Sequence, residues 1–142
     1  MIVSLTGVLW DQPTPAAGVP VNPRTALTFP LGNDVAVNLR VVKASGPPVT
    51  VDLSAPGVSL KLTVKRTPLD SNEMLSILAT AGAGLGNYVI VIPAALQRAR
   101  QLGPGRYFYD VLLTQVAGAT VTRDSVIPAS PLIVEPGIAN NP

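Results

Sequence analysis

The clearest pattern in this chain is the stretch Val58-Ser59-Leu60-Lys61-Leu62-Thr63-Val64-Lys65, in which apolar and polar residues alternate strictly. Because successive side chains of a pleated strand point to opposite sides, one side of this segment is apolar and the other is polar. Such a strand belongs to a sheet that is covered on one face only, which is typical of antiparallel β structure.

The same period of two recurs along the chain. In the segment 35–41 every second residue is apolar, and the other face carries Asn38 and Arg40. Residues 106–116 alternate in the same way, and Gly118 after them is expected at the tip of a hairpin. Turns rich in Gly, Pro, Asn and Asp separate the segments. Further strands are expected in the segments 2–10, 26–31, 74–80, 87–92, 119–123 and 132–135.

One segment departs from this pattern. Residues 93–102 consist of strong helix formers, with Pro93 suited to the first helical position and Gly103 able to end the helix in a left-handed conformation. Apolar residues on one side of this helix are expected to close one end of the core, and they are Leu96, Ala99 and Leu102.

These elements predict an all-β fold. We expect a two-sheet antiparallel β-sandwich of about seven to nine strands, with one short helix near residues 93–102 and extended Pro-rich arms. Residues 1–25 would hold an N-terminal strand and a Pro-rich arm, residues 26–135 the sandwich, and residues 136–142 a C-terminal tail. Residues 11–24 lack alternation, so we expect this arm to pack poorly against its own domain, and residues 126–142 to fray similarly.

Composition excludes most catalytic chemistry. The 142 residues include no His and no Cys, which excludes imidazole bases, thiol nucleophiles, disulfides and His- or Cys-ligated metals. The nearest acidic pair, Asp70 and Glu73, lacks the dense oxygen spacing of a calcium site and is typical of a turn or a helix cap. The Gly-rich segment 82–86 is followed by a strand and not by a helix, so it does not predict a phosphate loop. We predict no enzyme, no catalytic or metal site and no cofactor.

Charge and hydropathy exclude two kinds of partner. Ten basic and eight acidic residues give a net charge of +2, and no basic run reaches three residues, so nucleic acid is not an expected partner. No stretch has the ~18 uninterrupted apolar residues of a membrane span. The N-terminus has no basic region before its apolar stretch, so we expect no signal peptide and no membrane partner.

Aromatic residues and the arm provide the candidate contact residues. Tyr107 and Tyr109 could form a stacking platform, but buried rings with hydroxyls bonded to the backbone are the favoured interpretation. Trp10 either caps the core or anchors an interface, and both alternatives stay open. Partner binding is expected at Trp10, Pro13, Pro15, Pro20 and Arg24.

The order of motifs resembles a known family. Asp52-Leu53-Ser54 precedes the alternating strand 58–65, and Gly105-Arg106-Tyr107-Phe108-Tyr109-Asp110 follows the short helix. Over residues 27–135 this order resembles the immunoglobulin-like domain at the N-terminus of tailed-phage baseplate upper proteins, and related small proteins of phage tails and heads. The chain departs from that pattern at Ser54, where Thr is commoner, at residues 125–131, where a Gly is frequent, and in its extra N-terminal arm.

The resemblance implies an immunoglobulin-like form of the β-sandwich and a role without catalysis. It implies a structural component of a tailed-phage virion at the tail tip or baseplate, made in the host cytoplasm, that contacts other virion proteins in a symmetric assembly. Such a protein would be a homo-oligomer or present in many copies. The alternative is a capsid decoration protein that stabilises the head, and a carbohydrate-binding module with a glycan partner ranks behind both.

Overall fold

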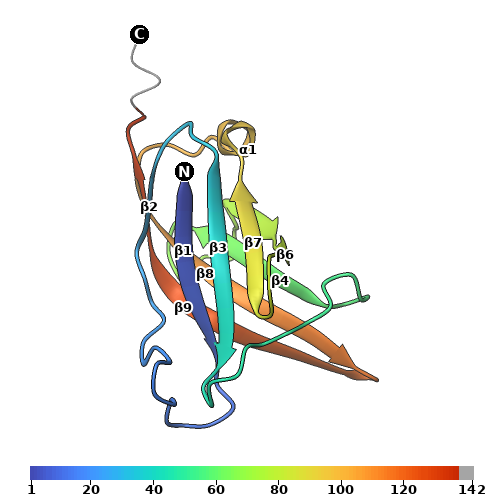
Figure 1. Cartoon of the computed structure of the whole chain (residues 1–142). Coiled ribbons are helices and arrows are strands. Elements are labelled where there is room, and N and C mark those ends of the chain that lie inside the picture. The colour runs from blue at the N-terminus through green and yellow to red at the C-terminus, as the bar shows by residue number, and fades with distance from the viewer. Residues whose placement is uncertain (138–142) are drawn as a thin grey trace.

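The alternating segments of the sequence become the strands of two β-sheets packed face to face (Figure 1). The computed structural model describes residues 1–137, and the end of the expected tail, 138–142, lies outside the described residues. Sheet A consists, in pairing order, of β1 (Ile2–Leu9), β3 (Val35–Lys43), β7 (Asn87–Ile92) and β6 (Thr80–Ala81). Sheet B consists of β2 (Leu27–Pro30), β9 (Thr120–Glu135), β8 (Gly105–Ala117), β4 (Ser59–Lys65) and β5 (Leu75–Leu78). The predicted all-β sandwich is confirmed.

Two strand pairs differ from the expected antiparallel arrangement. β1 runs parallel to β3, and β2 runs parallel to β9. Parallel neighbours need a long crossover and cannot be joined by a tight hairpin. Here residues 10–26 carry the chain from β1 in sheet A to β2 in sheet B, so neither strand is followed by its own pairing partner.

The C-terminal part of the fold also differs from expectation. The two short strands expected at 119–123 and 132–135 are one continuous strand, β9, which pairs with β8 along its length, so residues 126–135 do not fray. Between Tyr109 and Leu112 of β8 the register shifts twice, and each shift leaves an extra residue on β9. Pro128 lies in this bulged part, where a missing backbone N–H does not interrupt the ladder.

The β8–β9 hairpin turns where the sequence predicts it. Ala117 pairs with Thr120, and Gly118 between them has φ of 63°, as the first central residue of a type II′ turn requires. The hairpin extends past the sandwich (Figure 1), and its Val116 and Val121 are exposed.

The core lies between the inner faces of the two sheets and includes the tyrosine rings. Tyr107 and Tyr109 are buried, and their hydroxyls donate to the carbonyls of Gly103 (2.9 Å) and Thr25 (2.6 Å). This confirms the interpretation of both residues as core residues.

The short helix α1 (Ala94–Ala99) caps one end of the core, but not with the expected residues. Leu102 is buried and Leu96 half-buried, whereas Ala99 is exposed and Gln97 is fully buried. The residue in the left-handed conformation after the helix is Gln101, with φ of 54°, and not Gly103. No helix within residues 1–137 is both long and apolar enough to cross a membrane.

The buried Gln97 side chain is held by backbone groups of the β2–β3 loop. Its Nε2 donates to the Asn33 carbonyl (2.8 Å), and its Oε1 accepts from the Gly32 N–H (2.9 Å). An amide can be buried here because both of its ends have partners.

The N-terminal arm packs on sheet A more closely than the sequence predicts. The Ala16 N–H donates to the Ala44 carbonyl (2.7 Å), and Val19 packs on a small cluster of Val8, Val42 and Ala44. The reason is that β1 and β3 end in valines on their outer face, and the arm shields these valines from water.

The Asp11 carboxylate fixes the beginning of the arm. It accepts hydrogen bonds from the Ser45 hydroxyl and the Ser45 N–H (2.9 Å). The hydrogen bond from the Ser45 hydroxyl is the main reason why the pKa of Asp11 lies below its ordinary value.

Candidate interaction site

The middle of the outer face of sheet A carries polar side chains in two rows. Register places Ser4 of β1 beside Asn38 of β3, and Thr6 beside Arg40. Arg40 in turn lies opposite Asn87 of β7, and Asn38 opposite Val89. Strand alternation buries Leu5, Leu39 and Tyr88 on the other side, so these hydroxyl, amide and guanidinium groups face outward.

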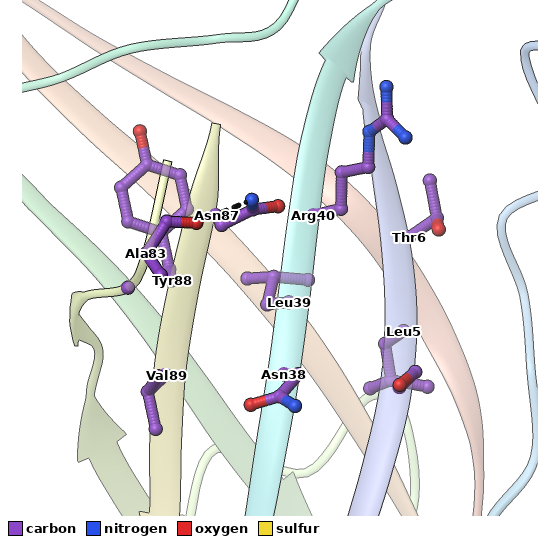
Figure 2. A pocket seen from close by; sticks show the side chains of 11 residues that line it. Leu5, Thr6, Asn38, Leu39, Arg40, Ala83, Asn87, Tyr88 and Val89 are labelled. Carbon is purple, nitrogen blue, oxygen red and sulfur yellow. Dashed lines mark hydrogen bonds between the residues drawn. The ribbon is translucent and has the colours of Figure 1, made fainter. Parts of the chain in front are cut away.

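These rows form the floor of an open groove of about 420 Å³ (Figure 2). The loop at Gly82 and Ala83 makes one wall. The Asn87 side chain is fixed there, because its Nδ2 donates to the Ala83 carbonyl (2.7 Å). With its amide nitrogen bonded to the loop, Asn87 presents its oxygen toward β3 (Figure 2).

Arg40 lies where this groove meets a second hollow. The second hollow, about 320 Å³, also contains Thr6 and Arg40, and its other wall is the arm at residues 17–20. The Arg40 side chain is exposed and rises beside Thr6 (Figure 2). A guanidinium group with its donors in a planar fork suits a carboxylate or another planar oxyanion.

Within residues 1–137, most carboxylates of this protein are bonded within the fold, whereas the Arg40 side chain is not. Among residues 1–137 one ion pair is present, between Lys61 and Glu73 (3.8 Å), so Arg40 has no carboxylate partner within that part of the chain. Half of the eight acidic side chains accept hydrogen bonds from nearby backbone N–H groups, and they are Asp11, Asp34, Asp52 and Asp70. The carboxylates are therefore largely used within the fold, whereas the Arg40 cation faces outward.

The residues expected to bind partners are spread along the arm. Trp10 is 44% exposed and does not cap the core. Pro13 and Arg24 are exposed, and Pro15 and Pro20 are half-buried. Pro20 lines the second hollow together with Arg40, and the other four line neither hollow.

A small hollow lies on the outer face of sheet B, beside Asp110. Burial is the main cause that raises the pKa of Asp110, and the nearby Glu73 raises it further, while Lys65 and Lys61 act in the opposite direction. The hollow beside Asp110 measures only about 10 Å³, which is scarcely the volume of one water molecule.

The other motifs singled out in the sequence have local structural partners. The Asp70 carboxylate accepts from the Asn72 N–H (3.0 Å), which is the predicted turn. The Gly-rich segment 82–86 joins β6 to β7. Within residues 1–137, no three acidic side chains gather into a metal-binding group.

The two aromatic side chains that are not buried, Trp10 and Phe108, lie at different sheets. Trp10 follows β1 of sheet A, whereas Phe108 lies on β8 of sheet B. Phe108 is half-buried, and the Arg106 guanidinium lies over its ring at 6.0 Å from the centroid. One sugar could stack on both rings only if the two rings lay on the same face of the molecule.

Sequence reasoning placed the contact residues in the arm and missed the groove beside it. The signal was partly present, since alternation put Asn38 and Arg40 on one face of the same strand. What alternation could not supply was the neighbour of that strand, because the parallel pairing of β1 with β3 depends on the whole topology.

Comparison with known proteins gives a likeness of fold. No family model and no curated protein matches this chain. Among solved structures, the N-terminal domain of phage TP901-1 ORF48 is similar, with a TM-score of 0.54 and 12% identity, over 94% of this chain and 98% of that one. The resemblance to a phage protein domain, expected from the order of motifs, is thus confirmed for the fold.

Two further solved structures match with lower TM-scores. Reduced rusticyanin matches with a TM-score of 0.37 and 12% identity over 94% of this chain and 79% of that chain. Rusticyanin from Thiobacillus ferrooxidans matches with a TM-score of 0.37 and 15% identity over 94% and 77%. A likeness at this level supports no inference about this chain.

Proposed function

We propose that this protein is a non-enzymatic structural component of a tailed-phage virion, located at the tail tip or baseplate and acting through contacts with other virion proteins. The observation that carries the proposal is the match to a phage protein domain over nearly the whole of both chains. A fold alone does not fix a function, so the proposal also depends on what the surface offers.

The surface supports contacts in preference to catalysis. The chain has no His or Cys, and the one acidic side chain within residues 1–137 with a raised pKa, Asp110, adjoins a hollow too small for a substrate. The exposed Trp10 and the arm residues Pro13, Pro15, Pro20 and Arg24 are the proposed contact residues. Trp and Arg are enriched among residues that dominate protein interfaces. In a symmetric particle many copies would make each weak contact multivalent.

The test is the presence and copy number of this protein in purified particles. We expect quantitative mass spectrometry of particles, with the major capsid and tail-tube proteins as internal standards, to find a few to a dozen copies per particle. Hundreds of copies would favour the alternative, a capsid decoration protein. Absence from infectious particles that are made in cells containing this protein would overturn the structural role itself.

A further inference from the structure

We propose that the outer face of sheet A is a docking surface for an extended acidic segment of another protein, whose carboxylate binds Arg40. This proposal specifies the chemistry of a partner for the structural role proposed above. It rests on that role, because the partner would be another protein of the particle. Its test uses the isolated chain, so the two proposals can fail separately.

The face has the composition of an interface. Above the polar rows, register aligns Ile2, Ala36 and Val91 in an outward apolar row, with Ile2 72% and Val91 46% exposed. Next to this apolar row lies the first polar row, with Ser4 and Asn38, and beyond it the second, with Thr6, Arg40 and Asn87. Apolar area beside hydrogen-bonding groups and one arginine is typical of protein contact sites.

Charge determines what kind of partner fits. Arg40 has no ion pair within residues 1–137, and four of the chain's own carboxylates are bonded to backbone N–H groups of their own fold. A second copy of this chain would have to break such bonds to supply these four, and Asp110, Asp124 and Glu135 lie in strands that already pair within sheet B, not on a free extended segment. A foreign Asp or Glu carries no such cost, and the Arg40 fork can bind it with two parallel hydrogen bonds.

Geometry determines the shape of the partner segment. The apolar row and the Arg40 row are four residues apart on each of the three strands, since Ile2 precedes Thr6, Ala36 precedes Arg40, and Asn87 precedes Val91. At ~3.3 Å per residue this is about 13 Å. An extended segment therefore reaches both rows when its apolar and acidic residues are also four positions apart.

The groove supplies hydrogen-bonding partners between the apolar row and Arg40. Asn38 and Ser4 line its floor, and the fixed Asn87 side chain stands at its edge with a free amide oxygen (Figure 2). Amides and hydroxyls can each donate or accept, so they can pair with polar groups of a segment whatever its sequence.

The experiment is a nuclear magnetic resonance titration of the whole chain with a short blocked peptide of Thr and Val that carries Leu and Glu four positions apart. We expect saturable shifts in the Asn38 and Asn87 side-chain amides and in the backbone of residues 36–40 and 87–91. The matched peptide with Gln in place of Glu should bind about tenfold more weakly, because a charge-assisted pair is lost. Arg40→Gln should abolish the difference between the two peptides, and Arg123→Gln, which removes an exposed cation on the β8–β9 hairpin, should preserve it.

Three results would overturn the proposal. They are equal binding of the Glu and Gln peptides, shifts confined to the arm or to the β8–β9 hairpin, and no saturable binding at millimolar peptide. Saturable shifts of the same residues by a uronic acid oligosaccharide, with none caused by the peptide, would assign this face to glycans instead.

Discussion

Single polar side chains join the loops of this protein to its core. The Tyr109 hydroxyl holds the end of the arm at Thr25, and the Tyr88 hydroxyl donates to the Val49 carbonyl (2.6 Å). Gln97 holds the β2–β3 loop in the same way. Within residues 1–137 no buried side-chain nitrogen or oxygen lacks a partner. Each of these residues fixes a segment that strand pairing does not reach.

The Tyr109 hydroxyl makes stability depend on pH in the alkaline range. Burial is the main cause that raises its pKa to about 12 from 10.0, partly opposed by a hydrogen bond from Ser130. The folded state therefore favours the neutral phenol, whose contribution is complete below pH 10 and is lost as the pH rises through 12. We expect the free energy of unfolding, measured in urea, to fall by at most about 2 kcal/mol over this interval. The Tyr109→Phe variant should not show this fall in the free energy of unfolding. An equal fall in the variant would contradict the assignment to Tyr109.

Replacing Gln97 should cost more than its place in a short helix suggests. Gln97→Leu leaves the Gly32 N–H and the Asn33 carbonyl without their partners, and we expect a loss of about 2–4 kcal/mol in the free energy of unfolding. The control is Arg98→Leu, an exposed position of the same helix, with an expected change below about 0.5 kcal/mol. Equal effects in the two variants would show that the amide bonds contribute little.

At the scale of elements, the two sheets meet closely where β1 passes β9. The bulges bring Val126 of β9 against Gly7 of β1, and a Cβ built on Gly7 would lie 3.1 Å from the Cβ of Val126. A glycine is favoured here by close approach and not by its backbone angle. The bulge and the glycine therefore belong to one packing arrangement at the corner of the sandwich.

Adding a methyl group at this corner should destabilise the fold. We expect Gly7→Ala to lower the free energy of unfolding by about 1–3 kcal/mol, because the backbone and Cβ of Val126 cannot move aside cheaply. Gly103→Ala is the matched control, since nothing lies within 4 Å of a Cβ at that position. Thermal or urea unfolding of both variants measures the difference, and a neutral Gly7→Ala would mean that the corner adapts.

Elements with a clear period were predictable from the sequence, and those fixed by distant partners were not. Alternation located β3, β4 and β8 because each has one buried face. Pro128 suggested a break in a strand, but a bulge that depends on β8 accommodates it. Gln97 gave no signal, since a glutamine among helix formers is ordinarily exposed. The groove at Arg40 needed the register of three strands, which no local pattern contains.

At the scale of the whole molecule, the two layers present different outer surfaces. Sheet A has a polar groove between an apolar row and the arm, whereas the hollow beside Asp110 on sheet B measures only about 10 Å³. Trp10 directly follows β1 of sheet A and is exposed. From there the arm continues to β2 in sheet B (Figure 1). Trp10 and the groove therefore lie on parts of the molecule that assembly partners can reach without disturbing the core.

Trp10 should matter for assembly and not for folding. We expect Trp10→Ala to change the free energy of unfolding by less than about 0.5 kcal/mol, because the side chain is exposed, and to reduce the amount of protein in purified particles severalfold. Leu69→Ala, at a position 97% exposed, serves as a control for the loss of a surface apolar group. Normal incorporation of a stable Trp10→Ala protein would remove Trp10 from the contact residues.

The parallel pairing of β2 with β9 has a consequence for biosynthesis. Leu27 to Pro30 are made long before their partners, Leu132 to Glu135. Until those residues have been made, the apolar side chains of Leu27 and Phe29 have no completed sheet to enter. Since contacts between distant parts of a sequence form slowly, we expect the nascent chain to carry this exposed segment until β9 has been made and to pair β2 only then.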